Sequence, residues 1–139
     1  MIYASRDQLE EVWGADFVGG LLPEDVDTAE AVGGALTRAS GEIDMYLSAR
    51  YVLPLAAAPS ALITPCANIA VYMLAIRHTA LTTTIEDRYK QTIDLMKRIA
   101  DGKAGLGEDE PRVSTDSDTS AGGAFFTASP RLFSRERLP

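Results

Sequence analysis

The side chains best suited to catalysis or metal binding are few and widely spaced in this chain of 139 residues. His78 is the only histidine and Cys66 the only cysteine, so an ordinary zinc site lacks its ligands. A single histidine that follows an apolar helical segment, beside Arg77, is typical of a helix end rather than of a general base. No glycine-rich segment precedes Lys-Ser or Lys-Thr, the pattern that holds a phosphate.

A group of carboxylates offers the other candidate for chemistry. Glu24, Asp25, Asp27 and Glu30 could suggest a cation site, but their spacing fits no calcium loop and no turn glycine lies among them. Asp27 and Glu30 suit the positive end of a helix dipole, so we interpret the group as a solvated helix start. The sequence therefore predicts no catalytic residue, no metal site and no cofactor, and a protein that is not an enzyme.

The C-terminal third carries the side chains with the clearest potential for binding. Residues 103–123 are rich in Gly, Ser and Asp, and cannot bury enough apolar surface to offset their ordering entropy. Residues 124–139 combine large apolar side chains with arginines that can pair bidentately with carboxylates. One alternative is a terminus without a binding role. We instead predict a segment that contacts another protein through Phe125, Phe126, Arg131, Leu132, Phe133, Ser134, Arg135, Arg137 and Leu138.

These compositions divide the chain into a body and an arm. Residues 1–102 form the predicted body, and residues 103–139 an extended C-terminal arm made of the polar spacer 103–123 and the docking segment 124–139. Apolar residues of the body recur at helical spacing, without convincing period-two alternation. We therefore predict an all-α fold, a small bundle of about four helices with a long arm.

Capping residues predict where the first helices begin. Ser5 and Gln8 form a capping box for a short helix that Gly14 ends, and a further turn follows. A longer helix begins at Asp27 or Thr28 and ends near residue 50, because the proline at position 54 disfavours helical geometry before it.

Two positions in the longer helices are open to more than one explanation. Gly33 and Gly34 each cost about 1 kcal/mol relative to alanine, so the pair either admits a neighbouring helix or marks a break. No charged residue lies between Arg50 and Arg77, but prolines interrupt this span, so we predict a buried central helix that begins around Ser60 rather than a membrane span. Within this helix, Pro65 introduces a kink, or Thr64 restarts the helix as a cap.

The last predicted helix is capped by Thr84 and closed by Gly102. Its predicted buried stripe consists of Ile85, Tyr89, Ile93, Met96 and Ile99. Cys66 is predicted to be a buried thiol, and a single cysteine permits no internal disulfide and favours a reducing compartment. The net charge of −7 argues against a general nucleic-acid binder, although not against a surface that DNA merely passes.

One block of the sequence, Ala39–Leu55, follows the pattern A-S-x-E-I-D-x-Y-L-x-x-R-Y-x-L-P-L. It resembles the Mu-type phage family of small head–tail connector proteins, also called adaptor or neck proteins. The resemblance extends in order over nearly the whole chain, through Ile2–Leu9, Glu86–Ile93, Ala100–Lys103 and Pro130–Leu138. The glycine pair departs from the alanine-rich helix expected in this family.

The resemblance implies a structural virion protein in the phage neck, assembled in the cytoplasm of the host bacterium. Its subunits would form a ring, commonly of twelve copies, between the portal protein and a tail-proximal neck or tail-terminator protein. Double-stranded DNA would pass through the lumen without specific binding, and acidic walls would repel its backbone. The alternative from another class is a small helical regulatory or assembly-chaperone module whose C-terminus is a linear binding motif.

Overall fold

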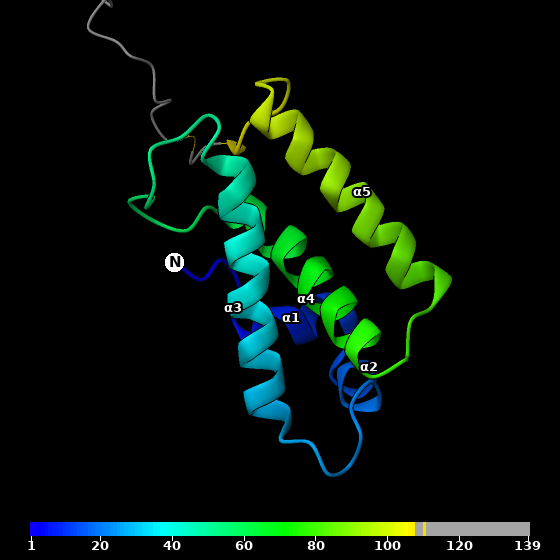
Figure 1. The fold of residues 1–139 in the computed structure, drawn as a ribbon. Helices are drawn as coiled ribbons and strands as arrows, with labels where there is room; N and C mark the ends of the chain where they lie inside the picture. Colours follow the sequence, from blue (N-terminus) through cyan, green and yellow to red (C-terminus); the bar gives the residue numbers. More distant parts are fainter. Residues whose placement is uncertain (108–109, 111–139) are drawn as a thin grey trace, which may run out of the picture.

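The structure is a computed structural model that describes residues 1–107 and residue 110. Its elements are α1 (Arg6–Trp13), α2 (Ala15–Gly20), α3 (Thr28–Leu47), a 3-10 turn (Ser60–Leu62), α4 (Ile63–Arg77) and α5 (Thr83–Ala100). Helix α4 lies in the middle and packs against α1, α3 and α5 (Figure 1). The predicted all-α fold is confirmed, with α2 as an additional short helix.

The predicted caps of α1 and α3 are present. The Ser5 hydroxyl accepts a hydrogen bond from the Gln8 amide at 3.3 Å, and the Gln8 side chain accepts one from the Ser5 amide at 2.9 Å. Gly14 ends α1 with φ at +94°, a conformation that favours glycine. Asp27 caps α3 by accepting a hydrogen bond from the Ala29 amide at 3.0 Å.

The predicted cap of α5 is wrong by two residues. Thr82, not Thr84, has the extended backbone of a cap and accepts the Ile85 amide on its hydroxyl at 3.3 Å. Consecutive threonines offer the same capping group, and the choice falls on the one whose backbone leaves the helix. Gly102, at φ +80°, follows the end of α5 as predicted.

The glycine pair neither breaks α3 nor admits another helix. Helix α3 is continuous, and a Cβ atom on Gly33 would meet no atom within 4 Å. A Cβ atom on Gly34 would meet only Arg38, at 3.8 Å. Both explanations drawn from the sequence are therefore wrong for residues 1–107 and residue 110. Pro65 lies in the first turn of α4, where its missing N–H breaks no helical hydrogen bond, and Thr64 caps nothing.

Helix α4 forms the centre of the core. Its buried residues lie all around the helix, and Cys66 among them is fully buried, as predicted. Burial raises the pKa of the Cys66 thiol. Ser60–Arg77 is long and apolar enough to cross a membrane, but half of it is buried, and three helices of the bundle contact α4. Packing in the core accounts for this apolar segment.

Candidate functional site at the root of the C-terminal arm

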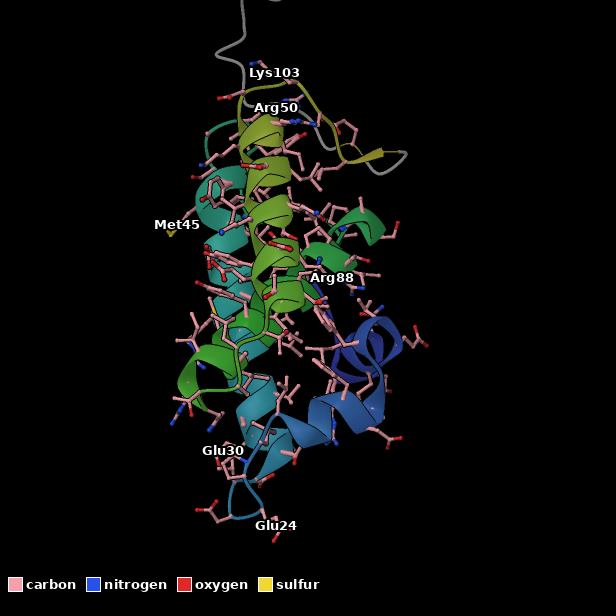
Figure 2. The ribbon with its side chains drawn as sticks, turned by 90° about the vertical axis from the view of Figure 1, so that its right-hand side faces the viewer. Glu24, Glu30, Met45, Arg50, Arg88 and Lys103 are labelled. Atoms are coloured by element: carbon pink, nitrogen blue, oxygen red, sulfur yellow. The ribbon has the colours of Figure 1, made fainter. Side chains whose placement is uncertain are left out.

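The predicted docking residues, from Phe125 to Leu138, lie outside the described residues, as does most of the predicted spacer. The described part of the chain does include the root of the arm, where residues 103–107 and Glu110 follow α5. Figure 2 shows Arg50 and Lys103 at the same end of the bundle, opposite Glu24 and Glu30. The arm therefore begins beside the C-terminal end of α3.

The chain beyond α3 presents two side chains to this root. The Tyr51 amide donates a hydrogen bond to the Leu47 carbonyl at 2.8 Å, and the Arg50 amide donates to the same carbonyl at 3.0 Å. These bonds hold the turn that follows α3, and they position Arg50 and Tyr51 at the end of the bundle.

Arg50 and Tyr51 hold the root through a set of polar contacts. Arg50 Nη1 donates a hydrogen bond to the Ala104 carbonyl at 2.7 Å, and its Nη2 lies 3.3 Å from Glu110 Oε1. The Tyr51 hydroxyl donates to the same Glu110 oxygen at 2.5 Å, and the Leu106 amide donates to the other oxygen. We call these five residues, Arg50, Tyr51, Ala104, Leu106 and Glu110, the arm-root latch.

The latch is partly withdrawn from water. Leu106 and Tyr51 are 1% and 2% exposed, whereas the Glu110 side chain is 32% exposed. The Tyr51 hydrogen bond, followed by the Leu106 amide, lowers the pKa of Glu110. Burial, together with the hydrogen bond to Glu110, raises the pKa of Tyr51 to about 12. Both shifts favour a neutral tyrosine bonded to a charged carboxylate.

Gly105 leaves room for this carboxylate. A Cβ atom on Gly105 would lie 2.8 Å from Glu110 Oε2, too close for an ordinary contact. Any larger residue at this position would therefore push the Glu110 carboxylate away from the Leu106 amide.

The second half of α3, just before Arg50 and Tyr51, also fastens the beginning of the chain. The Tyr3 amide donates to the Ser40 hydroxyl at 3.1 Å, and the Tyr3 hydroxyl donates to the Asp44 carboxylate. Burial, followed by the bond to Asp44, raises the pKa of Tyr3. Residues 40–51 thus hold both the first residues and the root of the arm.

The structural roles of Glu110 and Leu106 were not predicted, because a polar strip is ordinarily solvated. One signal was available: Leu106 is a large apolar side chain between two glycines, in a segment with few others. A solvated spacer gives no reason for such a residue.

A cleft of about 330 Å³ joins residues that sequence analysis considered separately. His78, Asp27 and Glu30 line it together with Arg38 and Arg77, between the start of α3 and the end of α4. Asp27 accepts hydrogen bonds from the amides at the start of α3. Nε2 of His78 is buried without a hydrogen-bond partner among the described residues, so this nitrogen bonds to neither carboxylate.

The comparison with known proteins covers both the body and the latch. Residues 3–124 match the protein family described as "Bacteriophage Mu, Gp36". The chain belongs to this family of Mu-type phage proteins. As a Gp36-family chain, it is 33% identical over 124 residues to the Mu-like prophage FluMu protein gp36 of Haemophilus influenzae, over 87% of this chain and 86% of that protein. It is also 33% identical over 106 residues to Gene product J of Escherichia phage Mu, over 74% of this chain and 70% of that protein.

The extent of the Gp36 match separates two parts of the chain. It includes the whole arm-root latch and ends at residue 124. The predicted docking residues begin at Phe125, so they lie beyond the matched residues.

Proposed function

We propose that this phage protein is a non-enzymatic head–tail connector subunit. Copies of it form a ring beneath the portal, join the DNA-filled head to the tail, and leave a channel for the genome. The observation that carries this proposal is the arm-root latch. A body that holds the first residues of its arm by several contacts sends that arm out from one defined point, as a subunit that links two parts of a particle requires.

The docking segment supplies the chemistry of attachment. Aromatic and arginine side chains typically contribute most of the binding energy of a protein interface. Phe125, Phe126 and Phe133 are suited to apolar pockets of a partner, and Arg131 and Arg135 to its carboxylates. The partners in this proposal are further copies of the chain, the portal protein, and a neck or tail-terminator protein on the tail side. The ring assembles in the host cytoplasm and stays in the neck of the virion.

The first test is a deletion of residues 130–139. The deletion leaves the described body intact, so we expect unchanged helical circular dichroism and an unchanged unfolding temperature. We expect attachment to the portal protein of the same phage to be lost in co-sedimentation. A variant with residues 130–139 in scrambled order, equal in length and composition, serves as the control for sequence. Unimpaired attachment of the shortened chain would contradict the proposal.

The alternative, a helical regulatory or chaperone-like module with a linear motif, uses the same arm but makes a different prediction. A connector remains in purified particles at a fixed ratio to the portal protein. A chaperone or regulator is absent from them, so quantitative mass spectrometry of particles separates the two.

A further inference from the structure

Within the described residues, no contact explains why position 33 is a glycine. Glycine in the interior of a helix is destabilising relative to alanine, yet α3 continues through this position without a break. No atom of the described residues comes within 4 Å of the place that its Cβ would occupy. The space above Gly33 is therefore left open by the body itself.

This space belongs to an apolar groove of about 520 Å³ between the beginning of the chain and α3. The residues that make its surface apolar are Ile2, Ala29, Gly33, Leu36, Ala58 and Ile63. Ile2 at its edge is 55% exposed. Small side chains at three of these positions keep the groove open, and an open apolar groove is typical of a place where another chain binds.

The chain itself contains a segment that suits this groove. Twenty-nine of the 139 residues follow Glu110, and they include the adjacent pair Phe125 and Phe126. Phenylalanine side chains fill apolar grooves effectively, because each buries a large area without a polar atom to satisfy. Residues 111–124 can span at most about 50 Å at 3.3–3.6 Å per residue, which sets the upper limit on the distance between the latch and the groove that the pair can reach.

The overall charge of the chain favours contact between this segment and a body, whereas the one charged side chain that lines the groove itself is Arg6. Residues 124–139 contain three arginines and one glutamate, a net charge of +2. Since the whole chain has a net charge of −7, residues 1–123 carry a net charge of −9. A positively charged segment is attracted to an acidic body of the same protein. It is repelled by other positively charged segments, which favours contact between a segment and a body.

We propose that the groove beside Gly33 receives Phe125 and Phe126 of a neighbouring copy. This inference rests on the proposed ring, because a ring uses a heterologous interface in which one chain carries both a patch and its complement. The groove is the patch and the phenylalanine pair is the complement. The residues from Leu132 to Leu138 remain available for the portal protein.

The experiment compares Gly33→Leu with Gly41→Leu. Both glycines lie in α3, and a Cβ atom on either would meet no atom within 4 Å, but only Gly33 lines the groove. Both substitutions favour the helix, so neither should lower the unfolding temperature. At a protein concentration at which the wild type is a ring by native mass spectrometry, we expect Gly41→Leu to remain a ring. We expect the ring of the Gly33→Leu variant to have a dissociation constant at least tenfold higher than that of the wild type.

Cysteine pairs establish whose segment fills the groove. In a Cys66→Ala background, Gly33→Cys and Phe126→Cys are made in separate chains, mixed and oxidised. We expect a disulfide-linked dimer, and none when Gly41→Cys replaces Gly33→Cys. An intramolecular disulfide in a dilute chain that carries both cysteines, without a dimer in the mixture, would show that the segment folds back on its own body and would overturn the inference.

The outcomes separate this inference from the proposed function. If Gly33→Leu assembles as the wild type does and no dimer forms, the groove is not the receptor, while ring formation and portal attachment still support the connector. If the wild type forms no ring, alone or with the portal protein, both proposals are contradicted.

Discussion

Glu110 is the residue on which the root of the arm depends. One carboxylate oxygen accepts the Tyr51 hydroxyl and faces Arg50, and the other accepts the Leu106 amide. A charged acceptor makes each of these hydrogen bonds stronger than a neutral one. The Glu110 carboxylate thus links Arg50 and Tyr51, in the turn after α3, to the buried residue Leu106.

We expect Glu110→Gln to loosen the latch, because the amide keeps the shape of the side chain but loses its charge. The carboxylate is about one-third exposed, so the free energy of unfolding should fall by only about 0.5–1 kcal/mol. Hydrogen exchange of the Leu106 amide should accelerate. Glu86→Gln, which removes the charge of an exposed helical pair with Lys90, is the matched control and should leave that amide unchanged.

The difference in unfolding free energy between the wild type and Glu110→Gln should depend on pH with a definite sign. The latch lowers the pKa of Glu110, so its stabilisation is complete above the ordinary pKa of glutamate and disappears as the pH falls through the lower folded value. Wild type and Glu110→Gln should therefore converge in acid. A constant difference at all pH values would mean that the charge has no part in the latch.

Two tyrosines predict a loss of stability in alkali. Burial and a carboxylate partner raise the pKa of Tyr51, which pairs with Glu110, and of Tyr89, which pairs with Glu42, to about 12. A raised pKa stabilises the fold below the ordinary value of about 10, and this stabilisation is lost as the pH rises through 12.

Urea unfolding at a series of alkaline pH values measures this loss. Tyr51→Phe and Tyr89→Phe should each reduce its steepness, and ultraviolet absorbance of tyrosinate should show late titration in the wild type. Tyr46→Phe is the control, since its hydroxyl makes no hydrogen bond to a carboxylate within the described part of the chain, unlike those of Tyr51 and Tyr89. Titration of all tyrosines near their ordinary pKa would refute the expectation.

At the scale of the elements, a series of two hydrogen bonds through the Asn68 side chain joins three helices. Trp13 of α1 donates its indole N–H to the Asn68 side chain of α4 at 3.1 Å. Asn68 in turn donates to the Thr92 hydroxyl of α5 at 3.1 Å. Arg88 covers the Trp13 ring at 4.4 Å, on the side of the bundle that Figure 2 shows. This chain fixes how α1 sits against the central helix.

We expect Asn68→Ala to be among the more destabilising substitutions in the body. It leaves the Trp13 N–H and the Thr92 hydroxyl without their partner, at about 2–3 kcal/mol of unfolding free energy. Arg88→Ala removes only the cation over the ring, and should cost no more than about 1 kcal/mol. Chemical denaturation of both variants provides the comparison, and equal losses would contradict the role given to Asn68.

The helices could be predicted from sequence better than the contacts between them. The capping box at Ser5 and the glycine after α5 are local signals, and both were predicted correctly. The cap at Thr82 was not, because neighbouring threonines differ only in backbone conformation. Thr92 was absent from the predicted stripe of α5, because a polar residue joins a core only when a partner such as Asn68 reaches it from another helix.

At the scale of the whole molecule, α3 connects the two ends of the described chain. Its second half holds Tyr3 through Ser40 and Asp44, and the turn beyond it holds Glu110 through Arg50 and Tyr51. The block Ala39–Leu55, which contains these residues of α3, was singled out only by its resemblance to a family of phage proteins. Its physical role could not be predicted, because each contact joins positions far apart in the chain and no local periodicity encodes such pairs.

The latch also has a place in time. Glu110 follows Tyr51 by 59 residues, and a ribosome that adds about 5–20 residues per second needs about 3–12 s to make that interval. Helix formation takes about a microsecond, so α3 and α4 have ample time to form and to pack on each other before Glu110 is added. A nascent chain therefore completes its latch only after most of the bundle, and a product that terminates before residue 110 keeps the Arg50–Ala104 hydrogen bond but lacks every contact that Glu110 makes.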